Sequence, residues 1–327
     1  MTAILGFGGY VPETVFTNDD WAAKLDTTDE WIIQRTGIKR RRFAGPDEST
    51  MTMSARAAEK ALGDAGLTAT DLDEIIIATD TPEARIPDTA SFLQHALGCR
   101  EIPGYDLGGS GCAGFVQALD VARARIHLEA KKILVIGVEL ITRMINMRDR
   151  STAVLFGDAA GAVILGPSGG AAKANIVDAV AGTDGSKTHI LTLVAGGTRL
   201  PFSREVLEAN EHKHLVMDGQ EVFRNAVRRM SQSVDEILAR IGKQTSDVAL
   251  IIPHQANKRI IDAVRRKLGV GEEIVYVNVH EYGNTGSASV PLALWEAQAS
   301  GRIQPGDLVI LTAFGAGFHW ASAALQF

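Results

Sequence analysis

Three residues whose side chains suit acyl-transfer chemistry lie far apart in this 327-residue sequence: Cys112, His254 and Asn284. Cys112 follows an apolar segment and a glycine-rich turn, and an apolar helix is expected to begin beside it. Unpaired N–H groups at a helix start favour a thiolate, so this position predicts a nucleophile. The alternative is a buried structural cysteine, which is the commoner role of an isolated cysteine. Cys99, the other cysteine, has no such setting and is interpreted as structural.

His254 ends an apolar run of strand length, and Asn284 lies in a glycine-flanked turn before another apolar helix. An imidazole and an amide both donate hydrogen bonds to a carbonyl oxygen that gains negative charge, and a cysteine accepts an acyl group. Together with Cys112 they predict thioester chemistry in a dry cavity. The turn at 314–317, FGAG, offers backbone N–H groups for an oxyanion hole. Its alternative is a packing turn, and the alternative for His254 is a loop histidine with satisfied partners.

The composition of the chain argues against several classes of function. The net charge of −6 disfavours nucleic acid as a partner, and two cysteines exclude a disulfide scaffold and a four-cysteine metal site. The eight histidines show no metal-ligand spacing, so no metal is expected. No apolar run approaches the roughly 18 to 20 residues of a membrane span, and the N-terminus lacks the pattern of a signal peptide. We therefore expect no membrane association and a cytoplasmic location.

Apolar runs of strand length alternate with amphipathic stretches of helical period, which predicts an α/β fold. The GFGGYVP segment near the N-terminus does not fit a dinucleotide fingerprint, because Pro12 interrupts the helix that must follow. The predicted strands are Glu74–Thr79, Ile133–Val138, Leu250–Pro253 and Leu308–Ala313, and two of the predicted helices are Met53–Ala65 and Val222–Ile241.

The two halves of the chain repeat one pattern at a constant offset of 175 residues, which pairs Thr79 with His254 and Ile133 with Leu308. A constant offset predicts two copies of one βαβαβ unit, residues 1–175 and 176–327, with the site between them. The repeat places the turns that carry Cys112 and Asn284 in equivalent positions. Residues 181–219 have weak periodicity and are predicted to form a long excursion that acts as a lid or substrate wall.

Six segments of the chain resemble the β-ketoacyl-acyl-carrier-protein synthase III family, the initiating condensing enzymes of bacterial type II fatty-acid synthesis. These segments are TTDEWIIQRTGIKRR, the Cys112 turn, LFGDAAGAVIL, PHQANKRII, YGNTGSASVPLAL and FGAGFHW. The resemblance runs nearly end to end. It implies the thiolase fold, with duplicated βαβαβ-type halves in a five-layered αβαβα arrangement, and a homodimer.

The resemblance also implies a mechanism. Cys112 would take an acyl group from an acyl-CoA, while His254 and Asn284 would hold a malonyl thioester and stabilise the enolate formed on decarboxylation. The N–H groups of Cys112 and Ala316 match the family's oxyanion hole. The product would be a 3-oxoacyl-carrier protein, and acyl-CoA and malonyl-carrier protein would be substrates, with no separate cofactor.

The resemblance also implies roles for residues outside the trio, assigned where their motifs match those of the family. Residues that match the CoA site are Thr27, Trp31, Arg35, Arg150 and Asn257, and those that match the carrier-protein docking patch are Arg224, Arg259, Arg266 and Lys267. Ile86 and Phe156 match the acyl pocket. Many relatives carry a large aromatic residue where Ile86 stands, so a primer longer or bulkier than acetyl is expected. The Gly-Ser-Gly turn before Cys112 departs from the family pattern, and so does His319. The sequence does not explain either departure.

Other interpretations of the chain stay open to different degrees. A related acyl-CoA acyltransferase or a condensing enzyme of specialised metabolism would use the same trio. A degradative thiolase is disfavoured because residues 314–318 contain no second cysteine, and an elongating synthase because Asn284 stands where a second histidine belongs. A papain-like hydrolase, which also orders Cys, His and Asn, lacks the α/β repeat. A non-catalytic carrier-binding protein would not need the intact trio.

Overall fold

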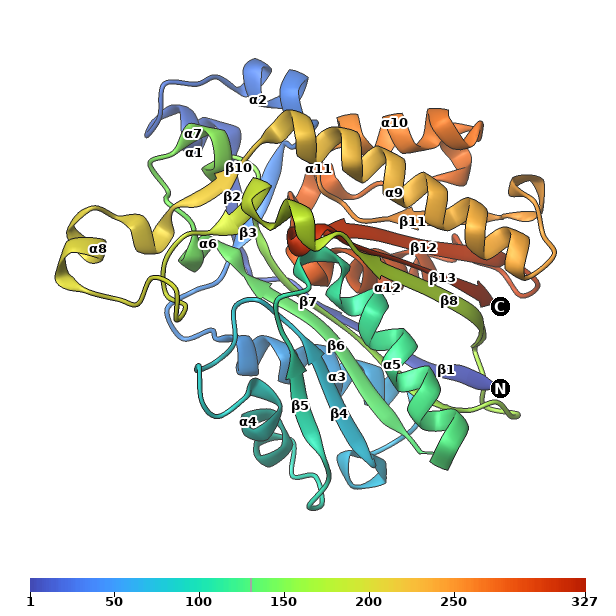
Figure 1. Cartoon of the computed structure of the whole chain (residues 1–327). Helices are drawn as coiled ribbons and strands as arrows, with labels where there is room; N and C mark the ends of the chain where they lie inside the picture. The colour runs from blue at the N-terminus through green and yellow to red at the C-terminus, as the bar shows by residue number, and fades with distance from the viewer. Residues whose placement is uncertain (130) are drawn as a thin grey trace.

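Nine strands form one hydrogen-bonded sheet system in the computed structural model, which describes residues 1–129 and 131–327 (Figure 1). The strand order is β11-β12-β13-β8-β1-β7-β6-β4-β5. The strands are β1 (Thr2–Tyr10), β4 (Glu74–Ala78), β5 (Gly104–Leu107), β6 (Ile133–Leu140), β7 (Asp158–Pro167), β8 (Ala174–Thr183), β11 (Leu250–Pro253), β12 (Leu308–Gly315) and β13 (His319–Gln326).

The sheet system has two equivalent parts that meet along one short seam. In the first part β4 pairs in parallel with β5 and β6, and β7 then runs antiparallel to β6 and β1. In the second part β11 and β12 are parallel, and β13 is antiparallel to β12 and β8. Only Thr2–Ile4 of β1 and Ala174–Ile176 of β8 join the two parts. The repeat inferred from the sequence is therefore present in the strand pairing.

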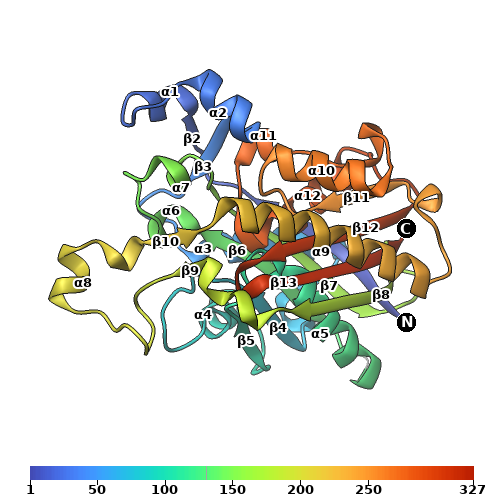
Figure 2. The same cartoon turned by 45° about the horizontal axis from the view of Figure 1, so that its top comes forward.

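Helices separate and cover the two parts of the sheet. Helices α5 and α12 contact strands of both parts and form the middle layer. Helices α3 and α4 cover the outer face of the first part, and α9 and α10 cover that of the second (Figures 1 and 2). The bounds are α3 (Thr50–Ala65), α4 (Thr89–Ala96), α5 (Gly114–Glu129), α9 (Gly219–Arg240), α10 (Lys258–Leu268) and α12 (Ser289–Ala299). This is the expected five-layered αβαβα arrangement.

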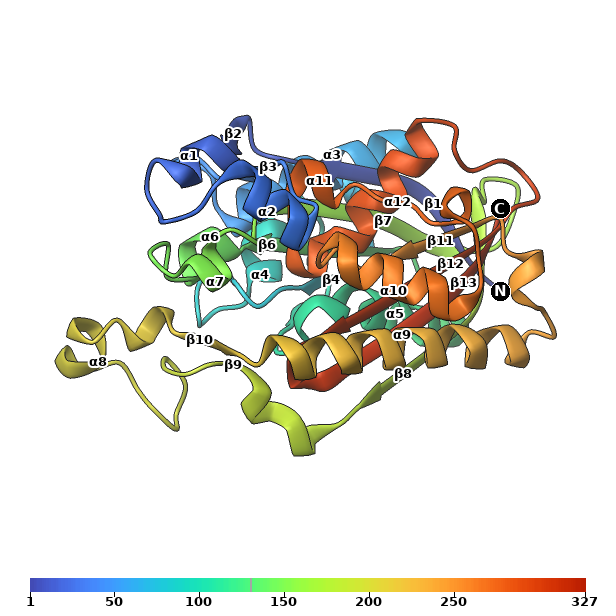
Figure 3. The same cartoon turned by 90° about the horizontal axis from the view of Figure 1, so that it is seen from above.

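Smaller elements connect the strands and helices of the sheet system. They are β2 (Thr14–Thr17), β3 (Arg40–Phe43), α1 (Asn18–Ala22), α2 (Asp29–Thr36), α6 (Ile141–Met144), α7 (Arg150–Ala153) and α11 (Val279–Tyr282), with 3-10 turns at η1 (Ala69–Asp71), η2 (Gly111–Ala113), η5 (Thr245–Asp247), η6 (Glu272–Ile274), η7 (Gly286–Ala288) and η8 (Ala316–Phe318). The excursion between the halves contains η3 (Gly185–Ile190), β9 (Leu191–Leu193), α8 (Arg204–Glu208), η4 (Glu211–Lys213) and β10 (Leu215–Met217). It projects from the body, with α8 at its tip (Figure 3).

The four strands predicted from apolar runs are all present, and their ends differ from the predicted ends by at most two residues. The two predicted helices start about three residues earlier than their apolar stripes, because polar caps extend them. Ser49 accepts a hydrogen bond from the N–H of Thr52 to cap α3, and Asp218 caps α9. The excursion is shorter than 181–219, since β8 continues to Thr183. The division of the chain at residue 175 falls within β8 and stays a prediction.

Candidate active site

The turn before α5, residues 108–113, carries Cys112 and is called the nucleophile turn below. It packs backbone to backbone against the end of β12, so that a Cβ atom on Gly111 would lie 2.4 Å from the Ala316 nitrogen. A Cβ on Gly315 would lie 2.3 Å from the Cys112 nitrogen. Gly111 also has a φ of +53°, which favours glycine. These two glycines bring the N–H groups of Cys112 and Ala316 close together.

The turn before α12, residues 283–288, carries Asn284 and is called the amide turn. The Asn284 N–H donates to the carbonyl of Leu155 at 2.8 Å, and its own carbonyl accepts from the N–H of Gly157 at 3.1 Å. The side-chain Oδ1 accepts from the N–H of Gly286 at 2.9 Å and lies 4.0 Å from the Cys112 Sγ. Because Oδ1 is occupied in this way, the Nδ2 group of Asn284 is left to donate to a ligand.

His254 follows the last residue of β11 and is buried, with 3% of its surface exposed. Its Nδ1 lies 2.6 Å from the Ser289 hydroxyl, which also accepts from the N–H of Gln255 at 3.5 Å. With the hydroxyl oxygen already accepting, we assign its proton to the bond with Nδ1, and this leaves Nε2 as the protonated nitrogen. Burial lowers the pKa of His254 to about 3, so the imidazole is neutral at pH 7.

One cavity of about 440 Å³ is lined by Cys112, His254 and Asn284 together with Ala316. Its remaining walls are mostly apolar and come partly from the excursion, through Leu191, Leu193 and Leu215 among others. The excursion therefore forms one wall of this cavity, and its role as a substrate wall stays a prediction. The three functional residues predicted from the sequence, one from the first half of the chain and two from the second, converge on this cavity.

The Cys112 thiol is not ionised by its helix start. Burial is the largest cause that raises its pKa, and the carboxyl groups of Glu139 and Asp80 raise it further. The contacts with its own backbone N–H and with Asn284 lower it by less. The helix start therefore favours the thiolate, as expected, but this short-range effect is weaker than desolvation of the sulfur.

A larger hollow of about 960 Å³ adjoins the cavity, and both are lined by Leu155, Met217, Val222, Asn257 and Ile260. Trp31 and Arg35 of α2 also line this hollow. The Trp31 ring lies between two guanidinium groups, that of Arg35 at 5.7 Å from the ring centroid and that of Arg150 at 4.9 Å. An indole flanked by cations is a suitable surface for a purine and phosphates.

Thr27 precedes α2 and does not line the hollow. Its hydroxyl is buried and finds no hydrogen-bond partner within the described residues. The Arg150 guanidinium donates to the carbonyl of Asp26, so the loop before α2 and the start of α7 are held together. Of the predicted CoA residues, Trp31, Arg35 and Asn257 therefore line the hollow, and Arg150 lies over the Trp31 ring.

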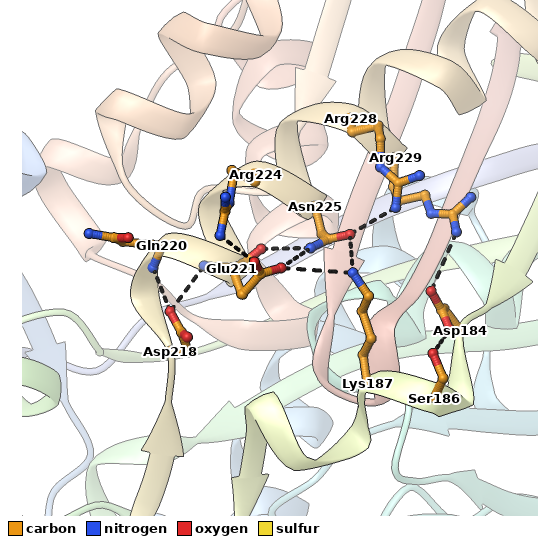
Figure 4. Close-up of polar contacts among 10 residues, drawn as sticks. All are labelled: Asp184, Ser186, Lys187, Asp218, Gln220, Glu221, Arg224, Asn225, Arg228 and Arg229. Atoms are coloured by element: carbon orange, nitrogen blue, oxygen red, sulfur yellow. Dashed lines mark hydrogen bonds and ion pairs between the residues drawn. The ribbon is translucent and has the colours of Figure 1, made fainter.

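The four residues predicted to dock a carrier protein are all exposed but are not one patch. Arg224 and Arg259 line the hollow, and Arg224 is paired with Glu221 of its own helix (Figure 4). Arg266 and Lys267 lie at the other end of α10, about 10 Å further along the helix axis. Docking at the hollow would engage the first pair most directly.

Polar contacts at the start of α9 anchor the base of the excursion (Figure 4). Lys187 of the excursion lies 3.2 Å from the Asn225 side-chain oxygen and 3.8 Å from Glu221. Arg229 lies 3.6 Å from Asp184. The cavity wall is thus fixed to α9, the same helix that lines the hollow.

The two predicted acyl-pocket residues have different positions. Phe156 lines the cavity and is 7% exposed. Ile86 lies outside the cavity and is 90% exposed. Within one chain Ile86 cannot limit the acyl group, so its predicted role requires a partner subunit.

Sequence reasoning missed three polar residues at the site. Ser289 orients His254, while Asp80 lines the cavity and Glu139 is buried behind it. Asp80 and Glu139 lie at or near the carboxyl ends of β4 and β6, where α/β proteins place reactive groups, and that signal was available. His319 is also placed by the structure, with its Nδ1 2.7 Å from the Thr183 hydroxyl.

Among the described residues, no helix is long and apolar enough to cross a membrane. No group of three or more His, Cys, Asp or Glu side chains within that part of the chain is arranged to hold a metal ion.

Comparisons with known proteins agree with this architecture. Models of the 3-oxoacyl-[acyl-carrier-protein] synthase III family match residues 105–185 and 238–327. A β-ketoacyl-[acyl-carrier-protein] synthase III of Oleidesulfovibrio alaskensis is 45% identical over 99% of this chain and 98% of its own length. The crystal structure of 3-oxoacyl-[acyl-carrier-protein] synthase III from Aquifex aeolicus has a TM-score of 0.92 at 40% identity and covers 100% of both chains. The priming β-ketosynthase of the R1128 polyketide pathway has a TM-score of 0.90 at 36% identity, with 100% of this chain and 96% of that chain covered. The chain therefore belongs to the 3-oxoacyl-[acyl-carrier-protein] synthase III family, whose members are acyltransferases with the thiolase fold.

Proposed function

We propose that this chain initiates fatty-acid synthesis by condensing an acyl-CoA primer with malonyl-acyl-carrier protein, through an acyl group carried on Cys112. One observation carries the proposal. The Cys112 thiol, the His254 imidazole and the Asn284 amide line the same cavity, beside two backbone N–H groups.

The first half-reaction acylates Cys112. The sulfur attacks the thioester carbonyl of the acyl-CoA, and the N–H groups of Cys112 and Ala316 hold the oxyanion. The carbon–sulfur bond to CoA then breaks, and the departing thiolate gains the proton that Cys112 loses. Because the pKa of Cys112 is raised, proton loss accompanies the arrival of the thioester and does not precede it.

The second half-reaction forms the carbon–carbon bond. The Nε2–H of His254 and the Nδ2–H of Asn284 donate to the carbonyl oxygen of the malonyl thioester, which stabilises the enolate formed as carbon dioxide leaves. The carbanion attacks the acyl carbonyl, and the Cys112 thiolate departs and is reprotonated. A neutral imidazole suits this step, since it donates one hydrogen bond without adding a buried charge.

The hollow beside Trp31 would hold the CoA nucleotide, with Arg35 and Arg150 flanking the ring and Asn257 at the junction with the cavity. The carrier protein would approach over Arg224 and Arg259. A guanidinium surface suits an acidic partner on an otherwise acidic chain. The homodimer, the cytoplasmic location and the bulky primer expected from Ile86 stay predictions.

The test is the intact mass of the protein after exposure to a panel of straight and branched acyl-CoAs. The wild type should gain one acyl group, and Cys112→Ala should gain none. His254→Ala should still be acylated but should release no carbon dioxide from malonyl-carrier protein. Condensation by Cys112→Ala at the wild-type rate would overturn the proposal, and a preference limited to acetyl would overturn the bulky-primer prediction.

The likeness to a priming ketosynthase of a polyketide pathway supports a second candidate, in which the same chemistry supplies a specialised product. The two candidates differ in the carrier protein they use. Condensation rates with the fatty-acid carrier and with carriers of specialised pathways from the same cell would separate them.

A further inference from the structure

A buried carboxylate, Glu139, lies between the nucleophile turn and the amide turn, and the proposed reaction gives it no part. It belongs to β6 and is 1% exposed. Its oxygens accept hydrogen bonds from the N–H of Asp80 at 3.0 Å, the Thr81 hydroxyl at 2.7 Å and the Ser287 hydroxyl at 3.0 Å. A buried carboxylate with three donors, drawn from both halves of the chain, is costly to place and specific in its contacts.

Asp80 continues this network into the nucleophile turn. Its Oδ1 accepts a hydrogen bond from the N–H of Gly109 at 2.8 Å, and the side chain lines the cavity that contains Cys112. Gly109 has a φ of +75°, which glycine adopts without strain, and the contact with Asp80 fixes the turn in this conformation. Glu139 thus holds Asp80, and Asp80 holds the turn of the nucleophile.

On its other side Glu139 packs against the amide turn. A Cβ atom on Gly286 would lie 2.6 Å from the Glu139 Cγ, which shows how closely the two approach. The Ser287 hydroxyl that donates to Glu139 also lies 2.8 Å from the carbonyl of Ala78, at the end of β4. The carboxylate is therefore in contact with both turns at once.

We propose that Glu139 and Asp80 are positioning residues for acyl transfer, which tie the nucleophile turn to the amide turn and place negative charge beside the Cys112 thiol. This inference rests on the function proposed above. It adds to that function a device, the carboxyl pair, that joins the two turns and disfavours the thiolate.

The charges around the thiol favour this device. After burial, the carboxyl groups of Glu139 and Asp80 are the largest influences that raise the pKa of Cys112. Burial and the neighbouring Asp80 raise the pKa of Glu139 to about 8, and burial raises that of Asp80. Each carboxyl disfavours ionisation of the other, so the two titrate as a pair.

Two histidines also face this region, and neither supplies a full positive charge. Burial lowers the pKa of His254 to about 3. Burial also lowers the pKa of His319, although the charge of Asp80 partly offsets this. The carboxyl pair is therefore the dominant charge beside the sulfur.

The experiment measures the rate of Cys112 alkylation by iodoacetamide against pH in the full-length protein. The variants are Asp80→Asn, Glu139→Gln and the double variant. The amide introduced by Asp80→Asn retains an oxygen that accepts from the N–H of Gly109, so this change removes the charge and keeps the contact. The matched control is Asp158→Asn, which removes another buried carboxylate, one that accepts from Ala44 and Thr142 and does not line the cavity.

Removing negative charge lowers the pKa of a neighbouring thiol, so the midpoint of the alkylation profile should move to lower pH. The double variant should react about tenfold faster than wild type at pH 7.5, which corresponds to a shift of about one pH unit. Each single variant should shift less in the same direction, because one carboxylate remains. Glu139→Gln should condense more slowly although its thiol reacts faster, because its N–H₂ group replaces one of the two accepting oxygens, which are Oε2 for Thr81 and Oε1 for Ser287.

Damage to the fold that exposes the cysteine would also lower the midpoint, because burial raises the pKa of Cys112. Each variant is therefore scored together with its urea-unfolding midpoint, and the Asp158→Asn control separates the two causes. Wild-type midpoints in both single variants would overturn the inference, as would an equal shift in Asp158→Asn. The single variants decide the question if the double variant fails to fold. Alkylation needs no acyl substrate, so this result is independent of whether the proposed condensation occurs.

Discussion

The turns that begin α5 and α12 have matching backbones and different chemistry. Both contain a 3-10 turn, Gly111–Ala113 and Gly286–Ala288, and the first glycines have φ values of +53° and +57°. The equivalent of Cys112 is Ser287, whose hydroxyl does not line the cavity and lies 2.8 Å from the Ala78 carbonyl and 3.0 Å from Glu139. One backbone device thus presents the proposed nucleophile in the first half and a structural hydroxyl in the second.

The ends of β4 and β11 differ in the same way. Thr79, in the first half, is buried in a hydrogen-bonded group with Thr81 and Glu139. Its equivalent, His254, is buried beside the cavity. The comparison indicates that duplication supplied two equivalent scaffolds, and that side-chain differences gave the nucleophile to one and the donors to the other.

The largest expected effect tests whether the two turns are interchangeable. Cys112→Ala should lower acylation at least about 1,000-fold, the scale seen when a nucleophile is removed. Adding Ser287→Cys should not restore it, because position 287 is 1% exposed and faces Glu139. The measurement is the intact mass after acyl-CoA, with the modified residue located by peptide mapping. Acylation at position 287 would show that the turns are chemically equivalent.

A smaller effect tests the close approach that only the nucleophile turn needs. Gly111→Ala should cost about 1 to 2 kcal/mol for its positive φ, and its Cβ would push against the Ala316 nitrogen 2.4 Å away. We expect acylation to fall by about 100-fold through the displaced oxyanion hole. Gly66→Ala is the control, since its φ of +65° carries similar strain but no atom lies within 4 Å. Urea unfolding and acylation rates measure both, and equal loss of activity in the two variants would contradict the argument.

The smallest effect concerns the buried imidazole that has no counterpart in the first half. The pKa of His254 is lowered to about 3, so between about pH 6.5 and pH 3 the unfolded chain binds a proton that the folded chain does not. Stability should therefore fall as the pH falls through this window, by about 1.4 kcal/mol per unit. His254→Asn should lack that part of the dependence. Urea unfolding at pH 7 and pH 5 measures it, and parallel curves for both proteins would contradict the burial of a neutral histidine.

Much of the architecture was predictable from local pattern. Strands β4, β6, β11 and β12 are buried on both faces and appear in the sequence as nearly unbroken aliphatic runs. The offset of 175 residues relates Gly114 to Ser289 at the starts of α5 and α12. Such features depend on residues close in sequence, or on similarity between two segments, and need no knowledge of contacts.

The site was predictable only in part. Sequence placed Cys112 and Asn284 in equivalent turns at helix starts and His254 at a strand end. It did not find Glu139, although the residue lies near the carboxyl end of its strand, because a single glutamate in an apolar strand gives no sign of its partners. Nor did it find the raised pKa of Cys112, since that depends on burial and on two carboxyl groups at the ends of β4 and β6.

The sequence by itself determined the α/β class, the duplication and the residue types that are proposed to do the chemistry, because these follow from periodicity and from the reactivity of single side chains. Only the tertiary structure decided the distances, the 4.0 Å between Cys112 and Asn284 among them, and the burial that makes His254 neutral. It also decided that one carboxylate joins both turns. The physical reason is that desolvation and charge act through space, between groups that the chain order keeps far apart.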